Sequence, residues 1–214
     1  MHHPIRLLVL AAVAACALAH APAQAQSQTV KLGYIYYDPH SKTNGITGIG
    51  IPPGADADVK GAGTLLFTYE VEVKPNVGVE FVLGLPPKIK AVATGPLAFL
   101  GEVLEARNVA PTVLVNYHFG SAGDTWRPYL GFGLNYTHFT NISTPYGWDV
   151  KLTDSAGMAV QAGMDYAISK QWGLYASVAR VDVRTKLVAT GATVLQSTID
   201  FRPWTYSFGA SYKF

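Results

Sequence analysis

Cysteine is almost absent from this sequence: the only one, Cys16, lies in an apolar segment near the N-terminus. The chain after that segment therefore has no thiol and can form no disulfide. Charged residues are also scarce, at 14% of the 214 residues, against about a quarter in ordinary soluble domains. The net charge is only +2 and no basic cluster occurs, so nucleic acid is not an expected partner.

The N-terminal segment has the layout of an export signal. Arg6 precedes an apolar run over residues 7–19, and Ala23, Gln24 and Ala25 form a small-residue cleavage site. We therefore expect residues 1–25 to be a signal peptide and residues 26–214 to be the mature domain. A lipid-anchored protein cleaved before Cys16 is the alternative, because residues 13–16 resemble a lipoprotein cleavage box.

Long apolar runs are missing from the rest of the chain, although 49% of all residues are hydrophobic. A spanning helix needs roughly 18 or more consecutive apolar residues, so no conventional transmembrane helix is expected. In hydrocarbon every backbone polar group must be paired, and only a helix or a closed barrel achieves this. The remaining way for so apolar a chain to cross a bilayer is a β-barrel.

Alternation of apolar and other residues recurs along the mature chain, as expected of strands with two different faces. The segments are residues 30–37, 65–74, 77–83, 113–119, 130–136, 158–166, 172–184 and 204–214. The segment 172–184 is apolar on both faces at first. We predict that its odd-numbered residues, Tyr175 to Val183, face outward, because this turns Arg180 and Asp182 away from lipid.

The connections between these segments alternate in length. Residues 74–76, 120–126 and 169–171 are short and turn-like, whereas residues 38–63, 86–110, 141–155 and 186–198 are long. The predicted fold is all-β: an eight-stranded antiparallel transmembrane β-barrel with long extracellular loops, short periplasmic turns and both termini on the periplasmic side. Leu97, Leu100 and Leu104 predict a short helix on the barrel rim.

Alternation also predicts what fills the lumen, which in a barrel of about eight strands is only wide enough for side chains. An apolar path is expected in the outer half, at Ile35, Tyr37, Leu66, Val82 and Leu114. A wall of small residues is expected at Gly131, Gly133, Ala159 and Gly163. A paired ionic floor is expected toward the periplasm, at Lys31, Glu70, Glu72, Lys74, Glu80, Asp165 and Lys213, because an isolated charge is costly there.

Residues 110–119, residues 127–139 and the closing Tyr-Lys-Phe resemble the OmpW/AlkL family, and the resemblance extends over nearly the whole mature chain. Gly209, Tyr212 and Phe214 also resemble the C-terminal signal read by the bacterial barrel assembly machinery. The resemblance implies an outer-membrane channel for passive uptake of small hydrophobic molecules, with lateral release into the bilayer. Residues 85–90 depart from the family's histidine-containing stretch, so no role of that histidine is carried over.

The expected location is the outer membrane of a Gram-negative bacterium, with the barrel as a monomer. The expected partners are outer-membrane lipid and lipopolysaccharide, small hydrophobic solutes and, during biogenesis, the assembly machinery. His40, His118 and His138 are dispersed, so neither a metal nor another cofactor is expected.

Two other functions remain open. The first alternative is a structural or adhesive barrel, in which the long loops bind a partner and the lumen is solid. The second is an outer-membrane lipid esterase, in which His138, Ser143, Ser155 and Asp149 converge near the outer rim. No Gly-x-Ser-x-Gly turn frames these serines, so we do not expect an enzyme.

Overall fold

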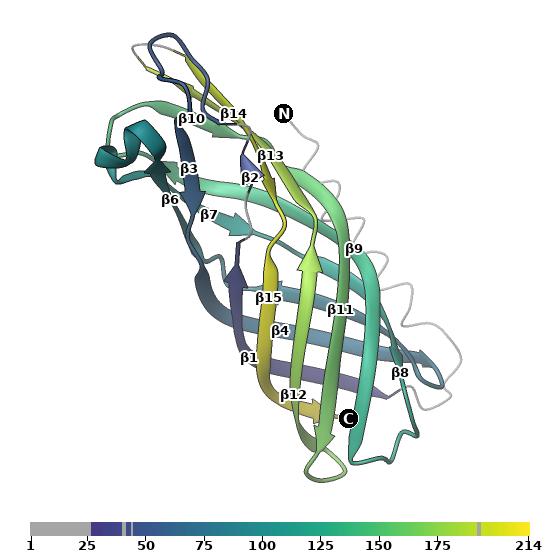
Figure 1. The fold of residues 1–214 in the computed structure, drawn as a ribbon. Helices are drawn as coiled ribbons and strands as arrows, with labels where there is room; N and C mark the ends of the chain where they lie inside the picture. Colours follow the sequence, from purple (N-terminus) through teal and green to yellow (C-terminus); the bar gives the residue numbers. More distant parts are fainter. Residues whose placement is uncertain (1–26, 40–41, 44, 192–193) are drawn as a thin grey trace.

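The computed structural model describes residues 27–39, 42–43, 45–191 and 194–214 (Figure 1). The predicted signal peptide over residues 1–25 and the predicted dispersed His40 lie outside the described residues.

The described chain forms a closed antiparallel barrel of eight strands, which confirms the predicted fold class. The strands are β1 (Gln28–Asp38), β4 (Ala62–Lys74), β5 (Val77–Gly84), β8 (Thr112–His118), β9 (Trp126–Ser143), β11 (Ser155–Ala167), β12 (Trp172–Val181) and β15 (Trp204–Lys213). Their order around the wall is β11-β12-β15-β1-β4-β5-β8-β9, and pairing of β9 with β11 closes it. Closure leaves no strand of the barrel as a free sheet edge.

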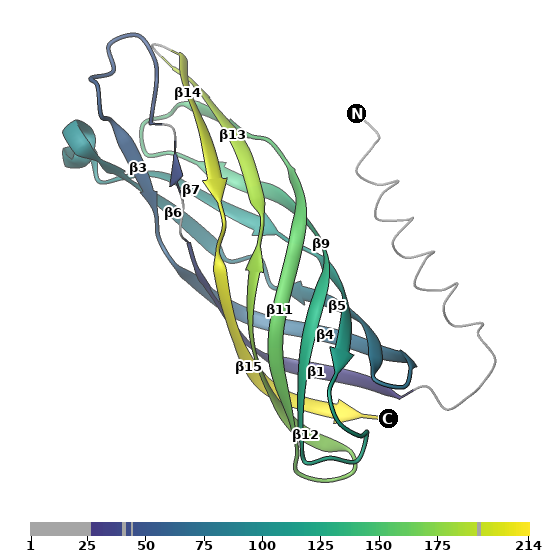
Figure 2. The ribbon, with the colours of Figure 1, turned by 45° about the vertical axis from the view of Figure 1, so that its right-hand side comes forward.

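The short connections all lie at one end of the barrel, here called the turn end, together with the C-terminus (Figures 1 and 2). The turn between β4 and β5 is made by Pro75 and Asn76. Asn76 has a φ of 66°, in the left-handed region. The amide of Phe214 donates to the carbonyl of Gln28 over 2.9 Å, so the two ends of the described chain meet there. The described chain therefore begins and ends on the short-turn side, as predicted.

The opposite, loop end differs from the prediction, because the expected long loops contain further strands. They contain β2 (Lys42–Thr43), β3 (Asp56–Val59), β6 (Lys88–Thr94), the 3₁₀ helix η1 (Gly95–Leu100), β7 (Glu102–Val109), β10 (Asp149–Leu152), β13 (Val183–Thr190) and β14 (Val194–Phe201). β10, β13, β14 and β2 form one sheet, and β3, β6 and β7 continue from β9. Burial still alternates along strands such as β13. The sheet of the barrel wall therefore extends beyond the apolar segments toward the loop end.

The predicted rim helix is confirmed only in part. Leu97 and Leu100 belong to η1, but Leu104 lies on β7. The intervening Gly101 has a φ of 65°, a conformation that ends the helical turn. Within the described part of the chain, no helix is long and apolar enough to cross a membrane.

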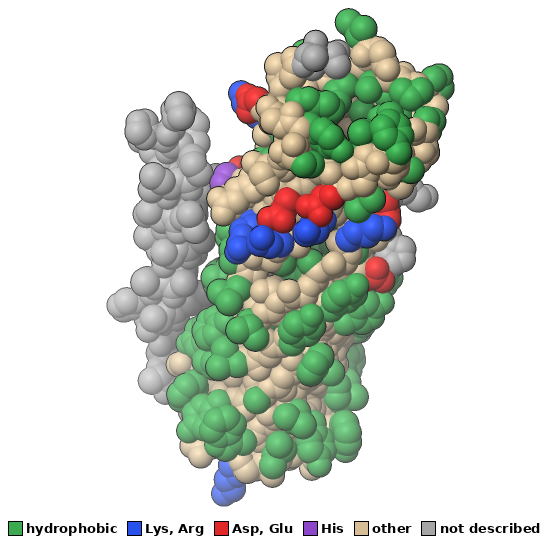
Figure 3. Space-filling view, turned by 90° about the vertical axis from the view of Figure 1, so that its left-hand side faces the viewer, with side chains coloured by type: hydrophobic (Ala, Val, Ile, Leu, Met, Phe, Trp, Pro, Cys, Tyr) green, Lys and Arg blue, Asp and Glu red, His purple; other side chains and the backbone are tan. Residues whose placement is uncertain are grey.

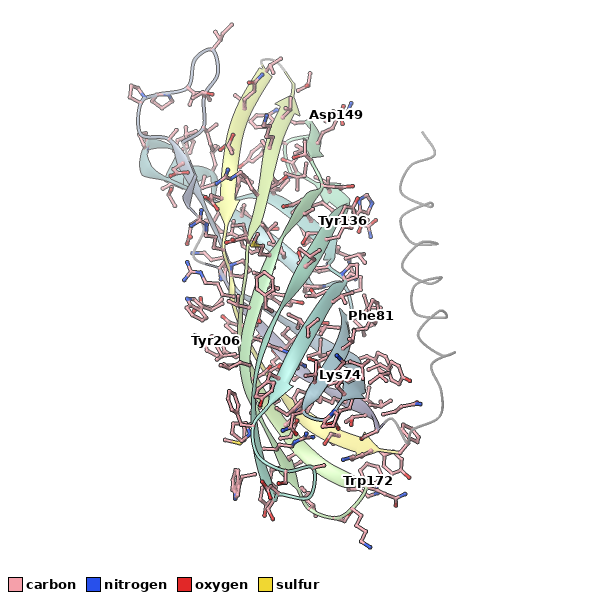
Figure 4. The ribbon with its side chains drawn as sticks, turned by 90° about the vertical axis from the view of Figure 1, so that its right-hand side faces the viewer. Lys74, Phe81, Tyr136, Asp149, Trp172 and Tyr206 are labelled. Atoms are coloured by element: carbon pink, nitrogen blue, oxygen red, sulfur yellow. The ribbon has the colours of Figure 1, made fainter. Side chains whose placement is uncertain are left out.

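The outer surface of the barrel is apolar over its middle. Leu32, Phe132, Leu134 and Phe208 are each more than half exposed, and outward residues at successive heights are labelled in Figure 4. On the face shown in Figure 3, charged side chains gather in a band above this apolar surface. A sharp boundary of this kind is expected where a barrel leaves the hydrocarbon of a bilayer.

The prediction for the facing of β12 is wrong. Tyr175 is 4% exposed and faces the lumen, whereas Leu174 is 48% exposed. Outward placement of Arg180 is tolerated because its guanidinium lies 5.1 Å from the ring centre of Trp204. A long cationic side chain can reach the membrane boundary from such a position.

Candidate functional site

A buried ionic cluster crosses the lumen toward the turn end. Its centre is Lys31, whose side chain is 1% exposed. The Lys31 Nζ lies 3.2 Å from Glu70 Oε2, 3.6 Å from Glu80 Oε1 and 3.3 Å from Asp165 Oδ1. These residues come from β1, β4, β5 and β11, so the cluster joins strands from around the barrel. Four of the seven predicted floor residues meet here, and we call this cluster the ionic floor.

Amide and imidazole groups complete the ionic floor. The Asn116 Nδ2 donates to Glu70 Oε1 over 3.2 Å and to Glu80 Oε2 over 2.8 Å. The Gln161 Nε2 donates to the same Glu80 oxygen over 2.7 Å, and His118 Nε2 is hydrogen-bonded to Glu70 Oε1 over 2.7 Å. Buried charges need such partners to offset the loss of hydration. The arrangement is a dense polar layer.

The other three predicted floor residues are not in this layer. Lys74 is exposed at the turn end (Figure 4), because a β-bulge between Glu72 and Lys74 interrupts the alternation of β4. Glu72 instead pairs with Arg127 over 2.9 Å, and Lys213 lies near it beside the mouth of the barrel. Sequence reasoning missed Arg127 and Gln161, although alternation along their strands places both inward.

Two tyrosine rings cover the ionic floor on its other side. Lys31 Nζ lies 4.7 Å from the ring centre of Tyr129 and 5.5 Å from that of Tyr175. Cation–π attraction stabilises an ammonium in this position. Tyr175 was missed because the facing of its strand was predicted wrongly, whereas Tyr129 follows the alternation of β9.

An apolar cavity of about 70 Å³ lies between these rings and the loop end. All five residues of the predicted apolar path line it: Ile35, Tyr37, Leu66, Val82 and Leu114. On the opposite wall the cavity is lined by Ala159, Ala179 and Val181. The lumen toward the loop end is therefore mainly apolar, with polar side chains such as Asn108, Asn135 and Thr137 in its wall, and the lumen toward the turn end is ionic.

The small residues of the predicted wall have different neighbours. Ala159 lines the cavity and is 1% exposed. A side chain at Gly131 would collide with Asn116 and Gln161, and one at Gly163 with the ring of Tyr129. A side chain at Gly133 would collide with the backbone at Val113. Gly131 and Gly163 therefore leave space for side chains of the lumen, and Gly133 allows close approach of the neighbouring strand. Of the four residues, only Ala159 lines the cavity.

A second, polar cavity of about 430 Å³ opens below the ionic floor. Its lining includes Glu70, Glu72, His118, Arg127, Asp165 and Lys213. It shares no lining residue with the apolar cavity. The ionic floor thus separates an apolar space from a polar vestibule at the turn end.

The barrel wall has a seam beside the apolar cavity. Pairing of β5 with β8 stops at Val82 and Thr112, and pairing of β6 with β7 resumes at Lys88 and Arg107. The segments between them contain Pro86, Pro87 and Pro111, which have no N–H to donate. We call residues 83–87 and 108–111 the seam. Gly84, Asn108 and Ala110 of the seam line the cavity.

The residues of the esterase alternative do not form a triad. His138 Nδ1 is hydrogen-bonded to Asp154 Oδ1 over 2.7 Å, rather than to Asp149. Ser155 is buried, and its hydroxyl accepts from the Arg184 amide over 2.9 Å. In the described ranges, no cluster of His, Cys, Asp and Glu could hold a metal ion.

Comparison with known proteins identifies relatives over most of the chain. The OmpW family model matches residues 24–214. Outer membrane protein W of Vibrio cholerae serotype O1 is 36% identical over 147 residues, covering 65% of this chain and 68% of that protein. Outer membrane protein AlkL of Ectopseudomonas oleovorans is 28% identical over 169 residues, covering 78% and 73%.

A solved structure has the same fold. The crystal structure of the outer membrane protein OprG from Pseudomonas aeruginosa has a TM-score of 0.83 and 27% sequence identity. The match covers 89% of this chain and 96% of that chain.

Proposed function

The chain belongs to the OmpW family and lies in the bacterial outer membrane, and from this premise we propose that it passively admits small hydrophobic molecules. In an outer-membrane barrel the short turns face the periplasm. A solute enters at the loop end, rests in the apolar cavity and leaves sideways through the seam into the bilayer.

The observation that carries this proposal is the position of the seam. Gly84 and Ala110 lie on its two sides and both line the apolar cavity. Straight descent toward the periplasm meets the ionic floor, where an apolar molecule would have to displace paired, buried charges. Exit through the seam breaks no ladder hydrogen bond between β5 and β8.

The size of the cavity implies that the wall moves during passage. About 70 Å³ is less than the roughly 150 Å³ of an engineered apolar cavity that binds benzene. Solutes must therefore displace side chains such as Leu66 and Leu114. Separation of the two sides of the seam breaks no ladder pairing between them.

A reversible cross-link across the seam tests lateral exit. If the register of β5 and β8 continued, Gly84 would lie opposite Ala110. The double variant Gly84→Cys/Ala110→Cys, joined by a short bifunctional thiol reagent, should lose most uptake of a fluorescent naphthylamine probe by cells. The mature chain has no cysteine of its own, so only the introduced pair reacts.

The matched control joins the same two strands below the seam. Val79 and Val115 are paired and Val115 faces the lipid side, so the cross-linked Val79→Cys/Val115→Cys variant should keep normal uptake. Normal uptake by the sealed seam variant would contradict lateral exit. Equal uptake by cells with and without the unmodified protein would support the solid-lumen alternative instead.

We also propose that the C-terminal strand carries the assembly signal. Tyr212 packs against Trp172 and Phe214, with ring centres 4.9 Å apart in both pairs. Phe214 is 70% exposed, so its removal costs the folded barrel little packing. Deleting Phe214 should therefore lower the amount of folded barrel in cells while refolding into detergent stays efficient. Equal loss in both settings would indicate a structural role.

A further inference from the structure

Two hydroxyl groups at the base of the apolar cavity have no partner among the described residues. They are the Tyr175 OH and the Thr68 Oγ1. Tyr175 is 4% exposed and Thr68 is 2% exposed, and both line the cavity. Buried hydroxyls without a hydrogen bond are uncommon and unfavourable. These two are therefore available to a molecule that occupies the cavity.

The glycines of β1 and β15 direct the Tyr175 hydroxyl into this position. Tyr175 is paired with Gly209, and Gly209 is paired with Gly33 on the next strand. The Tyr175 OH lies 2.5 Å from where a Cβ on Gly33 would be. Thr68 lies on the strand after that, opposite Lys31. Both hydroxyls therefore come from the part of the wall directly above the ionic floor.

The other hydroxyls and amides of the cavity wall are mostly occupied. Ser177 and Ser207 share a hydrogen bond of 2.7 Å. Asn135 donates to Thr112 over 2.8 Å and accepts from Thr137 over 2.8 Å. Asn108 Oδ1, in the seam, also lacks a partner, but it can only accept a hydrogen bond, whereas the two hydroxyls at the base can donate one.

The charge near the base disfavours an anionic ligand. Glu80 itself lines the cavity. Together with Glu70 and Asp165, Glu80 surrounds the ammonium of Lys31, and the rings of Tyr129 and Tyr175 cover that ammonium. A ligand carboxylate would approach like charges without reaching the cation directly.

We propose that the cavity selects hydrophobic molecules that carry one neutral oxygen group, as in an alcohol, aldehyde or ketone. The oxygen bonds to the Tyr175 and Thr68 hydroxyls, and the hydrocarbon part fills the space between Leu66, Leu114 and Val82. This inference rests on the proposed uptake function and narrows its substrate class. Alkanes of the same length enter but are held more weakly, and fatty acid anions are excluded.

The test uses the full barrel in lipid nanodiscs with labelled Ile, Leu, Val and Thr methyl groups. Octane, 1-octanol and octanoate are titrated at matched concentrations in the lipid, and NMR shifts of the Ile35, Leu66 and Thr68 methyls are followed. We expect 1-octanol to reach half-saturation at about three- to tenfold lower concentration than octane, as one or two hydrogen bonds would give. Octanoate should leave these methyls unshifted.

The variant Tyr175→Phe removes one hydroxyl and keeps the ring over Lys31. It should bring the half-saturation ratio of 1-octanol to octane close to one. The control Tyr34→Phe changes a lipid-side tyrosine that packs against Phe208 and should retain the preference. A titration of Thr68→Val, followed at the other methyls, should reduce the preference as well.

The outcomes separate this inference from the proposed function. Equal half-saturation by octane and 1-octanol in the unmodified barrel would overturn the selectivity and leave hydrophobic uptake standing. Binding of octanoate as tight as that of 1-octanol would also overturn it. Absence of any cavity shift with all three compounds would overturn both proposals.

Discussion

The ionic floor and the apolar cavity are built on the same strands, yet they are filled in opposite ways. In the floor, Lys31 is enclosed by three carboxylates, two tyrosine rings and the amide groups around them. In the cavity, side chains such as Leu66 and Leu114 leave a gap, and the wall beside it lacks ladder pairing. Each charged group of the ionic floor depends on the others for its partners, whereas the apolar side chains around the cavity form no such paired network.

This difference predicts which substitutions lower the stability of the barrel and which ones affect uptake. Removing one member of a buried ionic cluster leaves the others unpaired, so the floor should be sensitive to single changes. Removing or adding a methyl group in the cavity changes packing locally. Stability should therefore depend on the floor, and uptake should depend on the cavity.

The largest effect is expected from Lys31→Met. The substitution leaves Glu70, Glu80 and Asp165 without their shared cation in a buried layer, a loss of roughly 3–5 kcal/mol of unfolding free energy. The measurement is urea unfolding of the barrel in lipid vesicles. Lys170→Met, at an exposed position in a turn, is the matched control and should be neutral.

Neutralising the carboxylates around Lys31 tests whether the lost stability comes from unpaired charges. Lys31→Met combined with Glu70→Gln and Glu80→Gln should recover part of the lost stability, because fewer unpaired charges remain. A single Lys31→Met variant as stable as the unmodified protein would show that the floor is not a coupled ionic cluster.

A smaller effect on stability, but a clear one on uptake, is expected from Ala159→Leu. Ala159 lines the cavity and is almost fully buried, so the added atoms occupy the space proposed for the solute. Probe uptake by cells should fall severalfold, while overpacking typically costs about 1–3 kcal/mol of unfolding free energy. Ala162→Leu, on the lipid side of the same strand, is the control. Undiminished uptake with the leucine in place would remove the cavity from the route.

The smallest effect is expected outside the membrane-spanning region, at Asp154. Partial burial works to raise the pKa of Asp154, but hydrogen bonds from Tyr136 and His138 outweigh it and hold that pKa below its ordinary value. The resulting stabilisation is present above the unfolded-state pKa and is lost as the pH falls through the folded-state pKa. Solvent screens this exposed group, so the change is slight.

A pH series of the unfolding free energy, from about pH 6 to about pH 3, checks this point. Asp154→Asn should lose less stability over this range than the unmodified protein. Identical pH dependence of the two proteins would show that the bonds from Tyr136 and His138 do not stabilise the carboxylate.

The sequence predicted the barrel and much of the lumen because alternation is a local property of each strand. Lys31, Glu70, Glu80 and Asp165 could be placed at one height by counting along neighbouring strands. The facing of Tyr175 could not be found in this way, because its segment is apolar on both faces. Lys74 was misplaced because a bulge depends on the pairing partner and leaves little trace in the sequence.

The seam and the additional strands at the loop end could not be predicted from the sequence for a different reason. The interruption at Pro86 and Pro87 becomes a gap only because β7 and β8 also break near Pro111, in register across the wall. Strands such as β13 and β14 depend on each other for pairing. Such features arise from segments that are distant in sequence, whereas alternation reports one strand at a time.

The division of the lumen is tested most directly by crystallising the barrel with 1-bromooctane and locating the bromine by its anomalous scattering. We expect bromine between Ile35, Leu66 and Leu114, on the loop-end side of Tyr129, or at the seam beside Gly84 and Ala110. Bromine in the polar vestibule, among Glu72, Arg127 and Lys213, would show that apolar molecules pass the ionic floor and would contradict the proposed division of the lumen.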